Sequence, residues 1–270
     1  MKCQLGAVVV CVEDLGRRRK VLRTLSRALT AVPIYCAIIA VFSSCSNHQI
    51  TGVVRWNTWR YGYRLTDLHY ISQDIVSLGE FTNVVGVPPS DPNEPDEAGL
   101  KRVTNGVVHD SPEYIRATNQ EYLTITNFDG VLGRWFQMEH TNFPMTSSLL
   151  QKVFDDTWLI VEQAKKVNPI RKRPDGSTNS SSYPSGHAAE GLVLAEVLKQ
   201  LDPLHGDQAE QCGREIGRNR LVLNRHYPSD VEAGRQVGAW VLKQISRSGK
   251  YQRDFHAAQE ELRPHFNRSD

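Results

Sequence analysis

Helical periodicity dominates the second half of the 270-residue chain and limits the folds that it can adopt. From Thr146 to the basic pair Lys165-Lys166, apolar residues recur three and four positions apart, as on the buried face of an amphipathic helix. The repeating residues are Leu149, Leu150, Val153, Phe154, Trp158 and Val161. Similar patterns predict helices over about 187–201, 208–223 and 230–246, and a last amphipathic stretch over 251–262. Strand signals are scarce, so we predict an all-α fold, a helical bundle whose loops carry the unusual residues.

The first half of the chain gives three further structural signals. Residues 67–81 place four apolar side chains on one helical face, which predicts a helix there. Residues 88–96 hold prolines among acidic and polar residues and predict a loop. Ser111-Pro112-Glu113 combines a capping serine with a proline at the first helical position, which predicts the start of another helix.

The N-terminus is predicted to be an export signal over residues 1–45. Residues 1–44 hold seven Lys or Arg against two acidic residues, and the basic stretch 17–27 precedes an apolar run over 28–42. A run of this length is short for a transmembrane helix, which needs about 20 residues, and Pro33 interrupts it. We therefore expect an exported protein, periplasmic or tethered to a membrane.

Cys45 follows two small residues, Ser43 and Ser44, directly after the apolar run. This arrangement resembles a bacterial lipobox, in which Cys45 would be lipidated and would become the mature N-terminus. Two alternatives remain at this point: ordinary signal cleavage near residues 43–46, and an uncleaved anchor.

The remaining residues, 46–270, are predicted to form a single helical domain, a size that can bury one sizeable core. From residue 45 onward the chain carries 25 basic and 28 acidic residues, so its charge gives no case for nucleic-acid binding. There is no clustered Cys/His spacing for zinc and no calcium loop, so we expect neither a metal nor a cofactor. The sequence predicts no particular oligomeric state.

Three short segments between the predicted helices combine cations, small residues and histidines. They are Lys166 followed after six residues by Arg173-Pro174; Tyr183-Pro184-Ser185-Gly186-His187; and Arg220, five residues, His226, three residues, Asp230. Each segment alone has an ordinary structural explanation: a charge cluster at a helix end, a turn into a helix, or a surface ion pair. Their occurrence together and in this order indicates one site.

The residue types in these segments suit a phosphoryl group. A phosphoryl group in transfer spreads negative charge over three oxygens, so a site for it needs chiefly positioning and electrostatic stabilisation. Lys166, Arg173 and Arg220 supply three cations. Ser185 and the backbone N–H of Gly186 lie where a helix is predicted to begin, and the first amides of a helix favour an anion.

His226 is the candidate nucleophile of this site. Asp230 lies four residues further on, at the predicted start of a helix, where its carboxylate can accept a hydrogen bond from Nδ1–H of His226. The other ring nitrogen, Nε2, is then free to attack phosphorus. His187 suits the general acid that protonates the leaving alkoxide and later the base that activates water.

The three segments resemble the signature of the type 2 phosphatidic acid phosphatase superfamily, over roughly residues 146–240. Bacterial class A non-specific acid phosphatases, membrane lipid phosphatases and vanadium haloperoxidases belong to this superfamily. The resemblance implies the helical bundle of the acid phosphatase and vanadium-dependent haloperoxidase type, a phosphohistidine on His226, and His187 as general acid and base. The chain departs from the family at Asn219, where a serine usually precedes the motif arginine, and this departure puts Asn219 as a phosphate ligand in doubt.

We therefore predict a metal-independent acid phosphatase that hydrolyses small phosphate monoesters. Three alternatives use the same residues: a vanadium-dependent haloperoxidase, a tethered lipid or pyrophosphate phosphatase, and an anion-binding lipoprotein without catalytic activity. The set of His187, His226 and Asp230 argues against mere binding, because binding alone requires neither an acid nor a nucleophile. The sequence does not name the physiological substrate.

Overall fold

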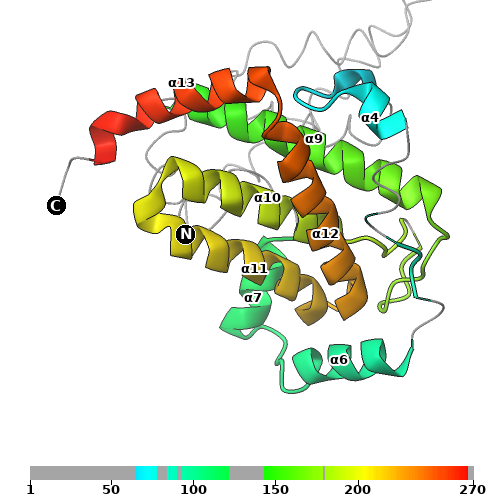
Figure 1. The fold of residues 1–270 in the computed structure, drawn as a ribbon. Helices are drawn as coiled ribbons and strands as arrows, with labels where there is room; N and C mark the ends of the chain where they lie inside the picture. The colour runs from blue at the N-terminus through cyan, green and yellow to red at the C-terminus, as the bar shows by residue number, and fades with distance from the viewer. Residues whose placement is uncertain are drawn as a thin grey trace, which may run out of the picture. The chain divides into compact units, whose positions relative to one another are not determined.

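The computed structural model describes residues 65–77, 84, 86–89, 93–121, 143–178 and 180–266, all within one compact unit that spans Tyr63–Asp270. Every regular element in this part of the chain is helical, which confirms the predicted all-α fold (Figure 1). The predicted export signal and Cys45 lie outside the described residues. None of the helices that the structure describes combines the length and the apolar character needed to cross a membrane.

The helices predicted in the second half of the chain are confirmed. The elements, in chain order, are η1 (Leu65–Asp67), α4 (Gln73–Ser77), α6 (Glu94–Thr104), α7 (Pro112–Asn119), α9 (Pro144–Val167), α10 (Gly186–Leu201), η4 (Pro203–His205), α11 (Gly206–Val222), α12 (Pro228–Ile245) and α13 (Gly249–Phe266). The predicted start of α7 is also confirmed: Ser111 caps the helix and accepts a hydrogen bond from the amide of Tyr114 at 3.2 Å.

The prediction of one helix over residues 67–81 is wrong. The described part of this segment forms η1, a bend and the short helix α4 instead. Asp156 of α9 explains the interruption, because its carboxylate accepts hydrogen bonds from the amides of His69 at 2.6 Å and Tyr70 at 2.8 Å. Amides that donate to a distant carboxylate are withdrawn from the hydrogen bonding of a local helix.

The predicted loop over residues 88–96 ends earlier than expected, because α6 begins at Glu94. Asn93 caps α6 and accepts a hydrogen bond from the amide of Asp96 at 3.0 Å. Pro95 lies in the first turn, where a proline breaks no helical hydrogen bond. The prolines that indicated a loop therefore include one that starts a helix.

Helix α10 packs against α9, α11 and α12 and holds the centre of the core (Figure 1). Glycines let the neighbouring helices approach it closely. A Cβ atom on Gly213 of α11 would lie 2.5 Å from the carbonyl oxygen of Gly191, and one on Gly234 of α12 would lie 2.2 Å from that of Ser185. The second contact brings the N-terminal end of α12 against the start of α10.

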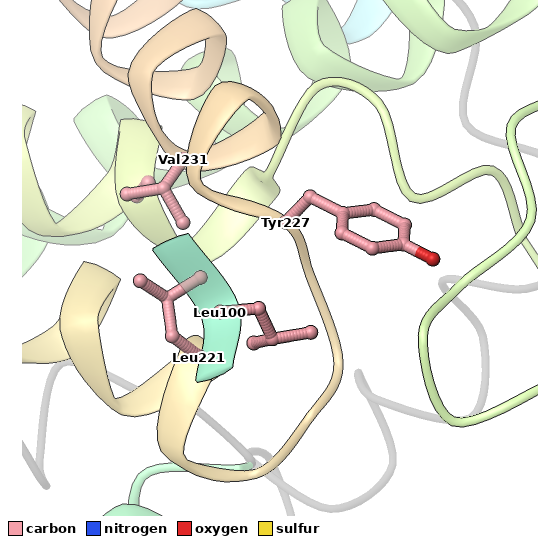
Figure 2. Packing of buried hydrophobic residues seen from close by; sticks show 5 residues of the cluster. Leu100, Leu221, Tyr227 and Val231 are labelled. Carbon is pink, nitrogen blue, oxygen red and sulfur yellow. The ribbon is translucent and has the colours of Figure 1, made fainter. Parts of the chain in front are cut away.

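A smaller apolar cluster fixes α6 beside the turn between α11 and α12. Leu100 of α6 packs with Leu221, Val231 and Tyr227, together with Ala188 of α10 (Figure 2). All five side chains are buried. This packing holds the first turn of α6 near the N-terminus of α12, where it contributes a charged residue to the site described below.

Candidate active site

The second and third predicted segments meet where α10 and α12 begin. The amide of Ser185 donates a hydrogen bond of 2.9 Å to the backbone carbonyl of Asp230. Ser185 is the residue before α10, and Asp230 lies in the first turn of α12. One backbone contact therefore joins the two segments that supply the candidate acid and the candidate nucleophile.

The start of α10 offers hydrogen-bond donors in a buried place. Ser185 is completely buried, and its hydroxyl has no hydrogen-bond partner among the described residues. Gly186 opens the helix, and the first amides of an α-helix have no partner within the helix itself. A hydroxyl and helical amides at one point form a site that suits an anion.

His226 is buried in the turn between α11 and α12. Its Nε2 lies 3.3 Å from Nη1 of Arg173, a guanidinium that donates and never accepts. In the neutral ring Nε2 must therefore carry the lone pair and Nδ1 the proton. This is the tautomer that a nucleophilic Nε2 requires.

The carboxylate of Asp230 faces the other side of the His226 ring. Oδ2 of Asp230 lies 3.8 Å from Nδ1 of His226, which is longer than the predicted hydrogen bond. The same oxygen accepts the amide of Tyr227 at 2.7 Å, and Oδ1 accepts Nη1 of Arg171 at 2.6 Å. The carboxylate is therefore held in place by its own contacts while it faces the ring.

Burial and nearby cations disfavour the charged form of both histidines. Burial lowers the pKa of His226 to about 4, and the charges of Arg173 and Arg220 act in the same direction, against the opposing effect of Asp230. Burial and Arg220 also hold the pKa of His187 well below its ordinary value. Despite its burial, Asp230 has a lowered pKa, because His226, the Tyr227 amide and Arg171 favour the carboxylate. The pair at α12 is thus a neutral imidazole beside an ionised carboxylate.

Two of the three predicted cations lie at this site. Arg173 donates to the carbonyls of Ser180 at 3.2 Å and Arg225 at 3.3 Å, besides its contact with His226. Arg220 is buried, and burial lowers its pKa to about 10. Its Nε and Nη1 have no partner among the described residues, so two buried donors remain to be satisfied.

The predicted third cation, Lys166, is not brought to the cluster in the structure: it is exposed near the end of α9. Its neighbour Lys165 points inward, with 14% of its side chain exposed, and donates to Glu162 at 2.9 Å and to Ser180 at 3.3 Å. Helical geometry accounts for the difference, because consecutive residues on a helix project about 100° apart. The spacing within the segment does not settle which of the two adjacent lysines faces inward.

Sequence reasoning missed the buried ion network behind Asp230. Arg171 bridges Asp230 and Asp96, with Nη2 at 2.6 Å from Oδ2 of Asp96. Asp96 also accepts the amide of Ser229 at 3.0 Å and its hydroxyl at 2.6 Å. The position of Arg171 two residues before Arg173 was a signal, but nothing in the sequence links Arg171 to Asp96, 75 positions away.

A second missed residue is Glu190, one turn into α10. It is 4% exposed, and burial raises its pKa to about 8, against the opposing charges of Lys165 and Arg220. Its Oε1 lies 3.9 Å from where a Cβ atom on Gly186 would be. A carboxyl group that stays protonated at neutral pH therefore lies directly behind the first turn of α10.

Asn219, which stands where the family has serine, is turned toward α7. Its Nδ2 donates a hydrogen bond of 2.6 Å to Oε1 of Gln120, and both residues are buried. The same end of α7 reaches the candidate acid, because Nε2 of His187 lies 3.0 Å from the carbonyl oxygen of Glu121. Among the residues that the structure describes, no three His, Cys, Asp or Glu side chains gather so that they could hold a metal ion.

Comparison with known proteins identifies phosphatase relatives, although no protein-family profile matches the chain. A non-specific acid phosphatase of Salmonella typhi is 29% identical over 170 residues, which cover 56% of this chain and 67% of the relative. A non-specific acid phosphatase of Providencia stuartii is 27% identical over 133 residues, 44% of this chain and 54% of the relative. A lipid A 1-phosphatase of Porphyromonas gingivalis is 37% identical over 82 residues, 29% of this chain and 18% of the relative.

The alignments thus span from about half to two thirds of these acid phosphatases, and a much smaller part of the lipid A 1-phosphatase. Their names agree with what the three segments and the geometry around His226 indicate. The chain is similar to bacterial non-specific acid phosphatases, and its predicted resemblance to the type 2 phosphatidic acid phosphatase superfamily is confirmed.

Proposed function

We propose that the chain is an acid phosphatase that hydrolyses phosphate monoesters through a phosphohistidine on His226, without a metal ion. One observation carries the proposal. The buried donors of Ser185 and Arg220 have no partner among the described residues, and they belong to the same cluster as a histidine whose Nε2 carries a lone pair. Buried donors of this kind call for an acceptor, and a phosphoryl group brings several charged oxygens.

In the first step Nε2 of His226 attacks phosphorus, and the bond from phosphorus to the ester oxygen breaks. The leaving alkoxide takes a proton from His187 and departs as the alcohol. Arg173 and Arg220 stabilise the charge on the phosphoryl oxygens, a role that metal ions fill in many other phosphoryl-transfer enzymes. Asp230 stabilises the positive charge that develops on the His226 ring, because its carboxylate lies 3.8 Å from Nδ1.

In the second step water attacks the phosphohistidine. His187, which is neutral after the first step, takes a proton from the water while the phosphorus–Nε2 bond breaks. Inorganic phosphate forms, and His226 recovers its lone pair. His187 regains in this step the proton that it gave up in the first, so the cycle closes without any other reactant.

His187 must be protonated when the ester is bound, although burial and Arg220 lower its pKa. A phosphate dianion beside the ring counters the positive charge of Arg220 and raises that pKa. Substrate binding therefore favours protonation of His187. Mildly acidic pH favours the complex in which the ester is bound and His187 is charged. This agrees with the acid phosphatase names of the relatives.

The direct test is hydrolysis of p-nitrophenyl phosphate by the full chain in the presence of EDTA. We expect turnover by wild type and by the control His109→Ala, whose histidine is exposed and pairs with Asp110. His226→Ala should lose nearly all activity, and acid-labile phosphate bound to the protein should accumulate in a His187→Ala variant. Full turnover by His226→Ala would contradict the phosphohistidine step, and loss of wild-type activity in EDTA would contradict metal independence.

The same wild-type protein can be used to distinguish a phosphatase from the alternative, a vanadium-dependent haloperoxidase. Vanadate resembles a phosphoryl group in transfer, so the cations and His226 could hold it equally well. We expect vanadate to inhibit phosphate release and to give no bromide oxidation with hydrogen peroxide.

Export remains a prediction for residues 1–45. The intact mass of the protein secreted by a bacterial host would distinguish three outcomes: lipidation of Cys45, cleavage near residues 43–46, and retention of the leader.

A further inference from the structure

The C-terminal end of α7 determines which nitrogen of His187 can exchange a proton with a substrate. The carbonyl oxygen of Glu121 lies 3.0 Å from Nε2 of His187. A carbonyl oxygen only accepts hydrogen bonds, so Nε2 carries a proton in every charge state that keeps this contact. The lone pair of the neutral ring is then on Nδ1, and Nδ1 takes the second proton when the ring becomes charged.

Two side-chain contacts hold the backbone carbonyl of Glu121 in place. Gln120 is 1% exposed, and its Oε1 accepts Nδ2 of Asn219 at 2.6 Å. The carboxylate of Glu121 pairs with Arg225, and Arg225 also pairs with Asp175. The end of α7 is therefore tied to α11 by a buried hydrogen bond and to the turn before α12 by an ion pair.

We propose that Gln120 and Glu121 are positioning residues for proton transfer by His187, with Asn219 and Arg225 as their anchors. The contacts fix the tautomer of His187 and direct Nδ1 toward the ester oxygen of the substrate. The inference rests on the proposed function, since it assigns His187 as the group that protonates the leaving alcohol. It also gives Asn219 a role that the serine of the family would not fill, because the shorter serine side chain carries no amide to reach Gln120.

The principal variant is Gln120→Met, which keeps the side-chain length and removes the acceptor for Asn219. Activity is compared on p-nitrophenyl phosphate, whose leaving group needs little protonation, and on phenyl phosphate, whose more basic leaving group depends on the acid. General acid–base catalysis contributes roughly 100- to 10,000-fold, so we expect kcat/KM on phenyl phosphate to fall about 10-fold or more. The fall on p-nitrophenyl phosphate should be much smaller.

A second test variant and a control accompany Gln120→Met in the comparison of the two substrates. Arg225→Gln removes the other anchor from a half-buried position, so it provides the test if Gln120→Met does not fold. The matched control is Arg218→Gln, which breaks an exposed pair with Glu113 at the opposite end of α7. The control should leave the ratio of the two activities at the wild-type value.

A purely structural role would lower both activities by the same factor, and this result in Gln120→Met or Arg225→Gln would overturn the inference. An unchanged ratio in both variants, with activity retained, would also overturn it. Failure of the proposed function is a different result: wild type would then hydrolyse neither ester.

The tautomer can be measured without any turnover. In protein labelled with ¹⁵N on histidine, two-bond proton–nitrogen spectra distinguish protonated from unprotonated ring nitrogens, and His187→Gln identifies the signals. We expect the neutral ring in wild type to carry its proton on Nε2, and Gln120→Met to show a mixture of tautomers. A proton on Nδ1 in wild type would overturn the inference whether or not the chain is a phosphatase.

Discussion

Nη1 of Arg171 lies 2.6 Å from Oδ1 of Asp230, so the carboxylate that faces His226 is itself held by a buried cation. Arg171 and Asp230 both have almost no exposed side chain, and Asp96 of α6 binds the same guanidinium. The ring of Tyr227 covers the guanidinium, 4.6 Å from its carbon to the ring centre. The network therefore joins α6 to the candidate catalytic turn through charges that are excluded from water.

Replacing Arg171 should destabilise the fold strongly. Arg171→Met leaves the carboxylates of Asp96 and Asp230 buried without their cation, and the loss of one partner of a buried pair costs about 3–5 kcal/mol. Denaturant unfolding of the variant measures this free energy. Arg214→Gln is the control, because its pair with Glu210 is exposed, and it should unfold like wild type. Equal stability of Arg171→Met and wild type would mean that the network does not support the fold.

Gly234→Ala should disturb the start of α10. The new Cβ would lie 2.2 Å from the carbonyl oxygen of Ser185, which is backbone and cannot move aside without shifting the helix. We expect a loss of about 1–3 kcal/mol in unfolding free energy from overpacking and weaker inhibition by inorganic phosphate. Gly249→Ala is the control, since its Cβ would meet only the end of the Arg253 side chain at 3.7 Å. Unchanged phosphate inhibition in Gly234→Ala would show that Ser185 does not contribute to binding.

Activity should fall on the acidic side as His226 becomes protonated. The pKa of this ring is lowered to about 4, so Nε2 keeps its lone pair above that pH and loses it below. We expect kcat/KM to decline as pH falls through about 4, well below the pH near 6 where a phosphate group loses its second proton. A pH profile of kcat/KM measures this limb. Activity that stays level as pH falls through about 4 would mean that His226 does not become protonated there.

The lowered pKa of His226 also predicts how the stability of the fold changes with pH. The pKa of His226 in the folded chain is lower than its ordinary value of 6.5, so the unfolded chain binds more protons between about pH 4 and 6.5. The contribution of His226 to stability is therefore complete above 6.5 and is lost as pH falls toward 4. Thermal or denaturant unfolding of wild type and His226→Gln over this window measures the contribution, and identical slopes with pH would contradict it.

The second half of the fold was predictable because its helices have continuous apolar faces. Leu149 and Val153 in α9 and Val237 and Val241 in α12 recur at helical spacing and are all buried. Residues 67–81 carry the same kind of pattern, yet a distant residue, Asp156, takes the amides of His69 and Tyr70. Local periodicity contains no information about such a long-range acceptor, so it predicted one helix where the structure has two short ones.

In the candidate site, too, local sequence patterns did not predict the long-range contacts. The segments around Ser185 and His226 were recognisable because their residues lie close together in the sequence and meet through one backbone hydrogen bond. Asp96 and Gln120 come from α6 and the end of α7, and only packing brings them near α11 and α12. Spacing within the first segment predicted Lys166, but which of the two adjacent lysines points inward depends on how the end of α9 is rotated against its neighbours.

Lys165 should matter more than Lys166 for binding phosphate. Lys165 is largely buried beside Ser180, whereas Lys166 is exposed, where water screens its charge. We expect Lys165→Met to weaken competitive inhibition by phosphate severalfold and Lys166→Met to leave it nearly unchanged. Inhibition constants at low and moderate ionic strength measure the difference. A larger effect of Lys166→Met than of Lys165→Met would support Lys166 as the phosphate ligand, as the sequence predicted.

Glu190 should limit phosphate binding at alkaline pH. Burial raises its pKa to about 8, so the carboxyl is neutral at mildly acidic pH and becomes charged only as pH rises through that value. The charged form competes with phosphate for Lys165 and Arg220, and Glu162 of α9 adds a further negative charge nearby. Glu190→Gln keeps the size of the side chain and mimics the neutral form.

The variant should therefore bind phosphate like wild type near pH 5 and more tightly than wild type above about pH 8. Phosphate inhibition constants across this range, or calorimetric binding where turnover is slow, measure the difference. Titration of His187 affects both proteins equally, so it cancels in the ratio of their affinities. A ratio that stays constant from pH 5 to 9 would mean that Glu190 does not ionise near the bound anion, and that its carboxyl serves only to fill the space behind Gly186.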